Sequence, residues 1–424
     1  MLKLHTEDPA EQAGEVRFTL DELAREGARR MLVAALEAEV AEYIERHQSE
    51  ADGAGRRQVV RNGTARARKL TLGAGTVEIT APRVNDRRVI EGERQRFTSE
   101  ILPPYMRRSP KVAEVLPVLY LRGLSTGDFQ AALPQLLGEE ASAGLSPSVI
   151  SRLLSSWEAE YRGFRERDLS GRDYVYVWAD GVHFRIRLEE DRLCARVVIG
   201  VRPDGTKELL AIEDGYREST ESWSSVLRDL ARRGMRAPGV AVGDAALGFW
   251  TAVAEVWPQT REQRCWVHRL ANVLDKLPKR LQPKAKDELR QIMNAENRSS
   301  AEQGIARFEA EYRAKCPKAV ASLVRDQEAL LTFFDFPAEH WKHLRTTNPI
   351  ESSFATVRLR QKVTKGAGSR TRGLVFAFKL LDMAGQRWRK LDGGALLPLV
   401  RAGIQFQDGV QVERQDQVQR KEAA

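Results

Sequence analysis

Two apolar runs in the middle of the chain each end on an aspartate. Residues 174–180 read Tyr-Val-Tyr-Val-Trp-Ala-Asp, and residues 239–244 read Gly-Val-Ala-Val-Gly-Asp. Short runs rich in β-branched and aromatic residues are typical of buried strands. The pattern therefore predicts strands at 174–180 and 239–243, with Asp180 and Asp244 at their ends.

Further elements are predicted around these two runs. The pattern indicates strands at 194–201, 207–213 and 261–265, and helices at 220–233 and 246–256. Three consecutive strands followed by alternating helix and strand fit a ribonuclease-H-like mixed sheet of the α/β class. In such a sheet the first and fourth strands are neighbours, so Asp180 and Asp244 would lie side by side.

The remainder of the C-terminal part has no strand pattern. Residues 270–343 are helical and polar, and the last residues are rich in Gln, Glu and Arg. We therefore expect a catalytic core in two parts, 169–269 and 344–404, interrupted by an all-α insertion at 270–343 and followed by a flexible tail at 405–424.

The N-terminal part contains three kinds of pattern. Leu32, Leu36 and Val40 recur at helical spacing in an amphipathic helix predicted at 19–48, whereas residues 76–80 alternate as in a strand. The regions expected are an amphipathic helical region at 1–50, a small basic β-containing region at 51–108 and a helix-turn-helix-like DNA-binding region at 109–168.

The third of these regions has the layout of a DNA-reading motif. Ser109-Pro110 predicts a helix start, a second helix is expected near 126–128 after a glycine-containing break, and a third is expected from 145. Ser148, Ser151 and Arg152 would lie near the N-terminal end of the recognition helix and contact DNA. A three-helix packing unit without DNA contact is the alternative.

Charge is distributed unevenly along the chain. The net charge is +9 and the pI about 9.5, which favours a polyanionic partner. Residues 56–108 hold 13 Lys and Arg against 5 Asp and Glu, and residues 357–390 hold 10 against one. The first segment contributes Arg61 and Arg66 as candidate DNA contacts.

The second basic segment follows Glu351 in the chain. Residues 366–369 interrupt it with two glycines, which would allow close backbone approach to a phosphate. A solvated helix face is the alternative to DNA contact. The candidate DNA-binding residues of this segment are Arg358, Arg360, Lys362, Lys365, Arg370 and Arg372.

The cellular compartment is indicated by what the sequence lacks. Three scattered cysteines do not make a disulfide framework, so a reducing cytosol is expected. No apolar stretch approaches the roughly 20 residues of a membrane span, and the N-terminus has no apolar signal region. We expect a soluble cytoplasmic protein with no membrane partner.

Asp180, Asp244 and Glu351 form the candidate chemistry. An aspartate that follows an apolar run is, taken alone, more often a turn or cap residue. Three converging carboxylates would repel one another unless cations neutralised them, and hard oxygen ligands favour Mg²⁺ or Mn²⁺. Two such ions, about 3.5–4 Å apart, can activate an attacking oxygen and stabilise a leaving one.

Four motifs together resemble a known family. They are Trp-Ala-Asp180-Gly-Val-His, Val-Gly-Asp244-Ala, Cys265-Trp-Val-His268 and Thr-Asn-Pro-Ile-Glu351-Ser-Ser-Phe. The chain resembles the bacterial mutator-type insertion-sequence transposases of the DDE transposase and retroviral-integrase superfamily. The resemblance covers roughly residues 20–400, including Arg61-Asn-Gly63 and the helix-turn-helix stretch.

The resemblance implies a DNA transposase with Asp180, Asp244 and Glu351 as catalytic residues and ligands of two Mg²⁺ or Mn²⁺ ions. Asp180 would bridge both ions. The nucleophile would first be water, which nicks the element's end, and then the freed 3′-hydroxyl. The partners implied are the terminal inverted repeats and target DNA, both double-stranded, and a homodimer or higher assembly. A nuclease on the same scaffold and a non-catalytic regulator of element ends are the alternatives.

Cys265 and His268 are spaced C-x-x-H, which raises the question of zinc. Two ligands do not make a structural zinc site, which usually needs four. His340 and His343 would supply more only if the helical insertion folded back. The resemblance instead identifies Cys265 and His268 as a family signature near the active site, where they would order the pocket or contact DNA. A packed structural histidine is the alternative for His268.

Overall fold

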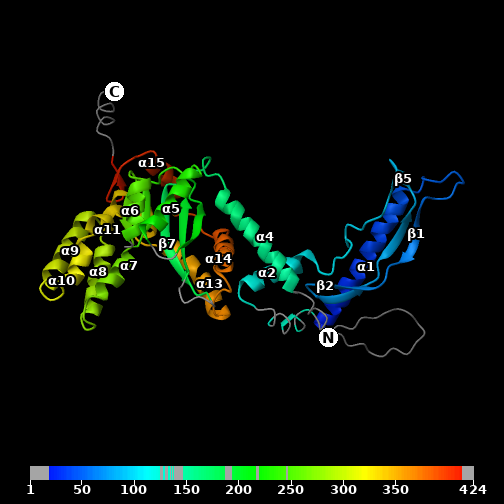
Figure 1. The fold of residues 1–424 in the computed structure, drawn as a ribbon, viewed down its shortest axis with the longest axis horizontal. Helices are drawn as coiled ribbons and strands as arrows, with labels where there is room; N and C mark the ends of the chain where they lie inside the picture. The colour runs from blue at the N-terminus through cyan, green and yellow to red at the C-terminus, as the bar shows by residue number, and fades with distance from the viewer. Residues whose placement is uncertain are drawn as a thin grey trace, which may run out of the picture. The chain divides into compact units, whose positions relative to one another are not determined.

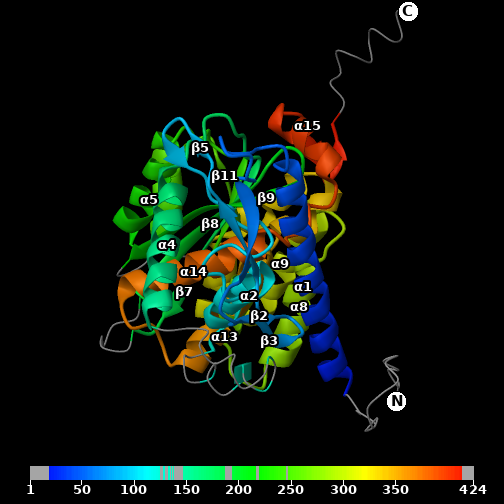
Figure 2. The ribbon, with the colours of Figure 1, turned by 90° about the vertical axis from the view of Figure 1, so that its right-hand side faces the viewer.

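The computed structural model describes residues 19–124, 128, 132–133, 135, 137, 147–186, 193–215, 219–244 and 247–412. The chain divides into two compact units, Met1–Leu153 and Leu154–Ala424. Figures 1 and 2 trace it from blue at the N-terminus to red at the C-terminus. Among the described residues, no helix is long and apolar enough to cross a membrane.

The C-terminal unit contains a five-stranded sheet in the order β11-β10-β7-β8-β9. The bounds are β7 (Tyr176–Phe184), β8 (Leu193–Val201), β9 (Lys207–Gly215), β10 (Val240–Gly243) and β11 (Arg261–Arg264). β8 is antiparallel to both β7 and β9, whereas β10 is parallel to both β7 and β11. The five predicted strands and the mixed sheet are confirmed, and the first and fourth strands are neighbours.

The pairing of β7 with β10 brings the two aspartates to the same level of the sheet. Val240 lies opposite Tyr176, and Val242 lies opposite Trp178. Asp244 and Asp180 are the next pair in this series, because each lies two positions beyond Val242 and Trp178 in its own strand direction. Asp244 therefore follows β10 at the level of Asp180 in the neighbouring strand, two positions past the last pair of the register.

Asp180 does not end its strand, so that prediction was wrong. β7 continues to Phe184, and Asp180 lies in its middle, opposite Val197 of β8. The reason is the antiparallel partner, because β8 pairs with β7 as far as Phe184 and extends it beyond the apolar run. Asp244, by contrast, directly follows the last residue of β10.

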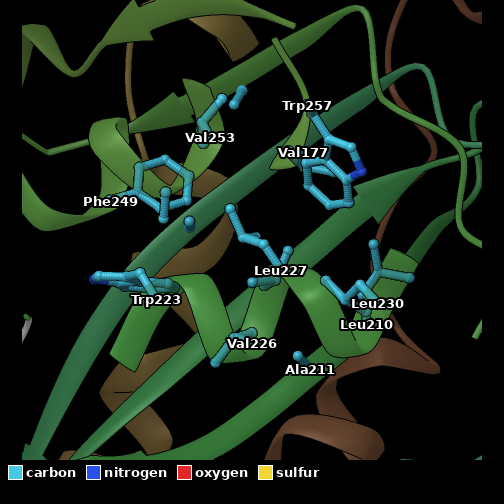
Figure 3. Close-up of a cluster of buried hydrophobic side chains, with 14 of the residues drawn as sticks. Val177, Leu210, Ala211, Trp223, Val226, Leu227, Leu230, Phe249, Val253 and Trp257 are labelled. Atoms are coloured by element: carbon cyan, nitrogen blue, oxygen red, sulfur yellow. The ribbon is translucent and has the colours of Figure 1, made fainter. Parts of the chain in front are cut away.

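Two helices bury one face of the sheet. They are α5 (Thr220–Arg232) and α6 (Leu247–Val256), close to the ranges predicted. Figure 3 shows Trp223 and Leu227 of α5 with Phe249 and Val253 of α6, all in the hydrophobic cluster that includes Val177 of β7. Because side chains alternate along a strand, Trp178 and Asp180 belong to the opposite face.

The opposite face is packed by the segment before residue 345. The indole Nε1 of Trp178 donates to the backbone oxygen of His343 over 2.9 Å. The hydroxyl of Tyr176 and Nδ1 of His340 form a buried hydrogen bond of 2.9 Å. This packing brings the chain after residue 345 to β7, where the helix α13 (Asn348–Thr364) contacts the strand.

Between β11 and α13 the described chain is helical. The elements are α7 (Trp266–Leu274), α8 (Gln282–Met293), α9 (Arg298–Tyr312), α10 (Pro317–Val324), α11 (Gln327–Leu331) and α12 (Trp341–Leu344), with 3-10 turns at Thr332–Asp335 and Ala338–His340. Figure 1 shows α8 to α11 as a group beside α7. α7 is fixed by the buried Arg269, which donates to Ser322 and Asp326 beside α10.

Beyond α13 the chain continues with α14 (Arg370–Gly385), a 3-10 turn (Gly394–Leu396), α15 (Leu397–Arg401) and the strands β12 (Phe406–Gln407) and β13 (Val410–Gln411). β12 and β13 form a hairpin at the start of the predicted tail. Gly409 N–H within that hairpin donates to the backbone oxygen of Phe334 over 3.2 Å.

The N-terminal unit packs one long helix on small sheets. α1 (Leu20–Arg46) begins at a capping box formed by Thr19 and Glu22. The strands are β1 (Val59–Thr64), β2 (Arg68–Leu72), β3 (Gly75–Ile79), β4 (Pro82–Asp86), β5 (Val89–Ile90) and β6 (Glu93–Arg94), which pair as β1 with β4, β2 with β3 and β5 with β6. Leu36 of α1 is buried with Leu70, Val77 and Ile79.

Two of the three helices predicted for 109–168 are described. α2 (Pro110–Leu121) begins at Ser109, whose hydroxyl accepts from Val112 N–H, as the Ser-Pro signal predicts. α4 (Pro147–Glu166) starts close to the predicted third helix. The expected start of the second helix near 126–128 lies almost wholly outside the described residues.

Candidate active site

Asp180 is held in the middle of β7 and is partly buried. Its Oδ1 accepts the backbone N–H of Gly181 over 2.8 Å, which orients the carboxylate along the strand. Asp244 begins the loop after β10, where its backbone oxygen accepts from Trp250 Nε1 over 2.7 Å. Trp250 belongs to α6 and its side chain is buried in the hydrophobic cluster, so this bond ties the backbone of Asp244 to the core.

Glu351 lies in the first turn of α13, which begins after Thr347. The buried hydroxyl of Thr347 donates to Glu351 Oε1 over 2.6 Å. Pro349 suits this position because the first turn of a helix does not need its N–H. The chain therefore presents a carboxylate from a fixed helix start, held by a neighbouring side chain.

His268 on α7 connects the acidic residues. Its Nδ1 lies 3.9 Å from Asp244 Oδ1, and its Nε2 lies 3.6 Å from Glu351 Oε1. The pKa of His268 is raised to about 9, mainly by its hydrogen bond with Cys265 and then by the negative charges of Asp244 and Asp180, against the opposing effect of burial. The imidazole is therefore protonated at neutral pH.

Cys265 ends the connection between β11 and α7 and is buried. Its Sγ accepts the backbone N–H of Thr347 over 3.3 Å, and the Thr347 hydroxyl lies 3.4 Å from the same sulfur. The sulfur atom thus joins α7 to the start of α13. Cys265, His268 and Glu351 offer a sulfur, a nitrogen and an oxygen that all lie within 4.8 Å of one another.

The structure therefore assembles the predicted residues from four elements. Asp180 lies in β7, Asp244 directly follows the neighbouring strand β10, and His268 lies 3.9 Å from Asp244 and 3.6 Å from Glu351. Thr347 is the residue that the sequence reasoning missed. A signal for it was present in the sequence: a threonine lies four residues before the glutamate, at the start of a proline-containing helix. His340 bonds Tyr176 and Gly393, and neither it nor His343 belongs to the cluster with Cys265.

The donor set suits hard divalent cations. Asp180, Asp244 and Glu351 each offer carboxylate oxygens, and Mg²⁺ binds to proteins through one or two carboxylates with water and substrate phosphate. Three carboxylates in one place are also costly without a compensating charge. The raised pKa of His268 favours a positive charge beside these acids.

The basic segment after Glu351 is only partly exposed. Arg360 is 7% exposed, with its guanidinium 4.0 Å from the centre of the Phe376 ring. Arg370 forms two bonds of 2.9 and 3.1 Å to the carboxylate of Asp214. These two are engaged within the fold, whereas the exposed members are Arg358, Lys362, Lys365 and Arg372.

The glycine at 366 has a structural reason for its place. Gly366 has a φ of +102°, and a Cβ at this position would lie 2.5 Å from the Arg185 backbone oxygen. Ala367 N–H donates to that same oxygen over 3.0 Å. The close approach that we expected toward a phosphate is thus made to the chain beyond β7.

The N-terminal unit contains a basic groove of about 660 Å³. Five arginines line it: Arg66, Arg68, Arg83, Arg94 and Arg96. Its one acidic lining residue, Asp86, is already paired with Arg88 over 2.7 Å. Of the described carboxylates, none forms an ion pair with Arg66, Arg83 or Arg96.

The other predicted DNA contacts of this part differ in their surroundings. Arg61 is exposed and donates two bonds, of 2.6 and 2.7 Å, to the carboxylate of Glu37. Ser151 and Arg152 are exposed on α4. The side chain of Ser148 lies outside the described residues.

Comparison with known proteins agrees with the motifs. The family model "Transposase, Mutator family" matches residues 2–367. The transposase for insertion sequence element IS6120 of Mycolicibacterium smegmatis is 57% identical over 303 residues, which are 72% of this chain and 93% of that protein. The transposase for insertion sequence element IST2 of Acidithiobacillus ferrooxidans is 47% identical, over 66% of this chain and 95% of its own.

Similarity to solved structures is weaker. The catalytic core domain of HTLV-2 integrase, solved in complex with magnesium, is 17% identical, and the match covers 30% of this chain and 88% of that domain, with a TM-score of 0.18. The family model and the two relatives decide the question: the chain belongs to the Mutator family of insertion-sequence transposases.

Proposed function

We propose that this transposase cuts and joins DNA at a divalent-metal site formed by Asp180, Asp244 and Glu351. The observation that carries the proposal is the parallel register of β7 and β10, which puts two aspartates from distant motifs side by side. The strand order and directions are those expected of a ribonuclease-H-like core. Residues 169–269 and 344–404 would form that core around the helical insertion at 270–343.

Asp180, Asp244 and Glu351 would hold two Mg²⁺ or Mn²⁺ ions. When bound, these ions would activate the attacking oxygen, first of water and then of a 3′-hydroxyl, and stabilise the leaving one. Thr347 fixes the rotamer of Glu351 through its 2.6 Å hydrogen bond. His268 lies 3.9 Å from Asp244 and 3.6 Å from Glu351, so its positive charge would partly offset the charge of these acids.

DNA as the partner follows from the family, and the exposed basic side chains indicate where it binds. Arg358, Lys362, Lys365 and Arg372 follow Glu351 along α13 and into α14, so they would hold the strand to be cut. The arginine-lined groove of the N-terminal unit suits a phosphate backbone, because its guanidinium groups lack carboxylate partners among the described residues. Residues 109–168 would read the terminal inverted repeats, with Ser151 and Arg152 on α4.

A homodimer or higher assembly is proposed because joining requires two DNA ends at once. Each protomer would bind one end through its N-terminal unit. Analytical ultracentrifugation of the purified protein with and without end DNA would test this point separately from catalysis.

The test of the function uses labelled duplexes that carry the ends of the insertion sequence, with Mg²⁺ or Mn²⁺. Wild type is compared with Asp180→Asn, Asp244→Asn and Glu351→Gln, and both nicked and joined products are scored. We expect nicking and joining by wild type and a loss of at least about 1000-fold in each variant. Cleavage by Asp180→Asn at the wild-type rate would reject the metal site. Nicking without joining would indicate a nuclease, and binding without any cleavage would indicate a regulator.

A further inference from the structure

We propose that Cys265, His268 and Glu351 form a second metal site, which binds a thiophilic ion such as Zn²⁺ and thereby inhibits the enzyme. Cys265 and His268 alone provide too few ligands, but the fold brings a third. The sulfur, an imidazole nitrogen and a carboxylate oxygen all lie within 4.8 Å of one another. Three protein ligands with an open fourth position are the usual set of an accessible zinc site.

The geometry is close to that of a bound ion. Zinc bonds of about 2.0–2.3 Å in a tetrahedral arrangement put ligand atoms roughly 3.3–3.6 Å apart. The distance between His268 Nε2 and Glu351 Oε1 is 3.6 Å. Cys265 directly precedes α7 and His268 lies in its first turn, and the two side chains are hydrogen-bonded to each other.

The surroundings are also those of a metal-binding cluster. Thr347 donates its backbone N–H to Cys265 Sγ over 3.3 Å and its hydroxyl to Glu351 Oε1 over 2.6 Å. His268 Nδ1 is buried without a hydrogen-bond partner among the described residues and lies 3.9 Å from Asp244 Oδ1, so the imidazole is not held by a hydrogen bond to that carboxylate. The His268 and Glu351 side chains are 30% and 25% exposed, which leaves an entry route from their side.

The chemistry of the ligands decides which ion this site selects. Thiolate and imidazole ligands favour Zn²⁺ and Co²⁺ over Mg²⁺, which prefers oxygen. The ion would displace the thiol proton of Cys265 and one ring proton of His268 to the solvent, so its affinity should rise with pH. Glu351 belongs to both proposed sites and cannot complete them at once. Zinc binding at Cys265 and His268 would therefore remove Glu351 from the catalytic metal. This inhibition rests on the proposed role of Glu351, whereas the binding itself does not.

The binding is tested with Co²⁺ added to the metal-free full-length protein, read by the near-ultraviolet charge-transfer absorption of a cobalt–thiolate bond. We expect the band in wild type, in Asp180→Asn and in Cys316→Ser, whose cysteine is buried elsewhere at the start of α10. The band should vanish in Cys265→Ser. In His268→Gln the affinity for Co²⁺, measured from the same band, should fall at least tenfold. Displacement by Zn²⁺ completes the measurement.

The outcomes separate this proposal from the function. No band in folded wild type, or a band that persists in Cys265→Ser, would overturn the site. If Cys265→Ser does not fold, as judged by circular dichroism, the loss of affinity in His268→Gln decides. Asp180→Asn should keep the cobalt band and lose Mg²⁺-dependent cleavage. The band therefore tests the second metal site, and cleavage tests the catalytic proposal separately. Zn²⁺ should inhibit cleavage by wild type, and a chelator should restore it. If His268→Gln retains cleavage, at least ten times more Zn²⁺ should be needed to inhibit this variant. Both results would connect zinc binding at this site to loss of activity.

Discussion

The buried hydroxyl of Thr347 donates to Oε1 of Glu351 over 2.6 Å, at the start of the helix that carries the glutamate. This contact positions the carboxylate without itself being exposed to substrate. Outer partners of metal ligands commonly affect metal affinity or activity 10–100-fold. Substitution of Thr347 therefore tests how strongly the proposed metal site depends on this hydrogen bond.

Thr347→Val keeps the side-chain volume and removes the hydroxyl. We expect Mg²⁺-dependent cleavage to fall about 10–100-fold, with a higher Mg²⁺ concentration needed for half activity. Thr347→Ser keeps the hydroxyl and should retain most activity. Initial rates across a Mg²⁺ titration check the expectation, and equal titration curves for the Val and wild-type proteins would remove Thr347 from the site.

Arg360 and Lys362 lie within one turn of α13 but in opposite environments. Arg360 is buried over Phe376, so Arg360→Gln should lower the free energy of unfolding by about 1–3 kcal/mol without changing the salt dependence of DNA binding. Lys362 is exposed, so Lys362→Gln should leave unfolding almost unchanged and reduce the slope of log K against log salt by about 0.9. Thermal melts and binding titrations at several salt concentrations measure both. An unchanged slope in Lys362→Gln would exclude it from the DNA interface.

The groove of the N-terminal unit can be tested with a matched pair of arginines. Arg83 lines the groove, whereas Arg61 on the paired strand is bonded to Glu37. Arg83→Gln should reduce the salt slope of DNA binding by about 0.9, because one phosphate contact is lost. Arg61→Gln removes the same charge and should change the slope less. Equal slopes for both variants would mean that net charge alone, and not the groove, controls binding.

Asp86 makes the stability of the N-terminal unit depend on pH. The pKa of this buried carboxyl is lowered to about 2, mainly by its hydrogen bonds from Arg88, with a further bond of 2.7 Å from the Tyr43 hydroxyl. The native state therefore favours the charged form. Its contribution of about 2 kcal/mol is complete above pH 4–5 and is lost as the pH falls towards 2.

Asp86→Asn should remove this pH dependence and make the unit less stable at pH 7. All eight tryptophans lie at residue 157 or beyond, so tryptophan fluorescence does not report on this unit. Hydrogen exchange of peptides from α1 provides the measurement. If the exchange rates of these peptides change with pH to the same extent in wild type and in Asp86→Asn, Asp86 is not the group that makes the stability depend on pH.

The sequence predicted the elements of the sheet better than their ends. The apolar runs identified β7 and β10, and their order in the chain was enough to expect them as neighbours. Antiparallel pairing with β8 extended β7 beyond Asp180, and no local pattern contains that pairing. The length of β7 was set by its pairing with β8, which is a property of the sheet and not of the local sequence.

Charge patterns were less informative about individual side chains. Arg360 and Lys362 look alike in a basic segment, but packing against Phe376 separates them. Gly366 looked suited to a phosphate, and instead lies against the backbone of Arg185. Helix periodicity tells which positions share a face, but the neighbour that covers the face comes from a distant part of the chain.

Glu351 lies far beyond Asp244 in the chain, and α13 contacts β7 only after the whole helical segment has been synthesised. During translation, the N-terminal unit and both aspartates would leave the ribosome well before the third carboxylate. A polypeptide that stops short of α13 would lack both the third carboxylate of the proposed site and the helix that packs against β7. The last part of the chain to be synthesised therefore completes the proposed site, so that a nascent chain has no complete set of the three acids.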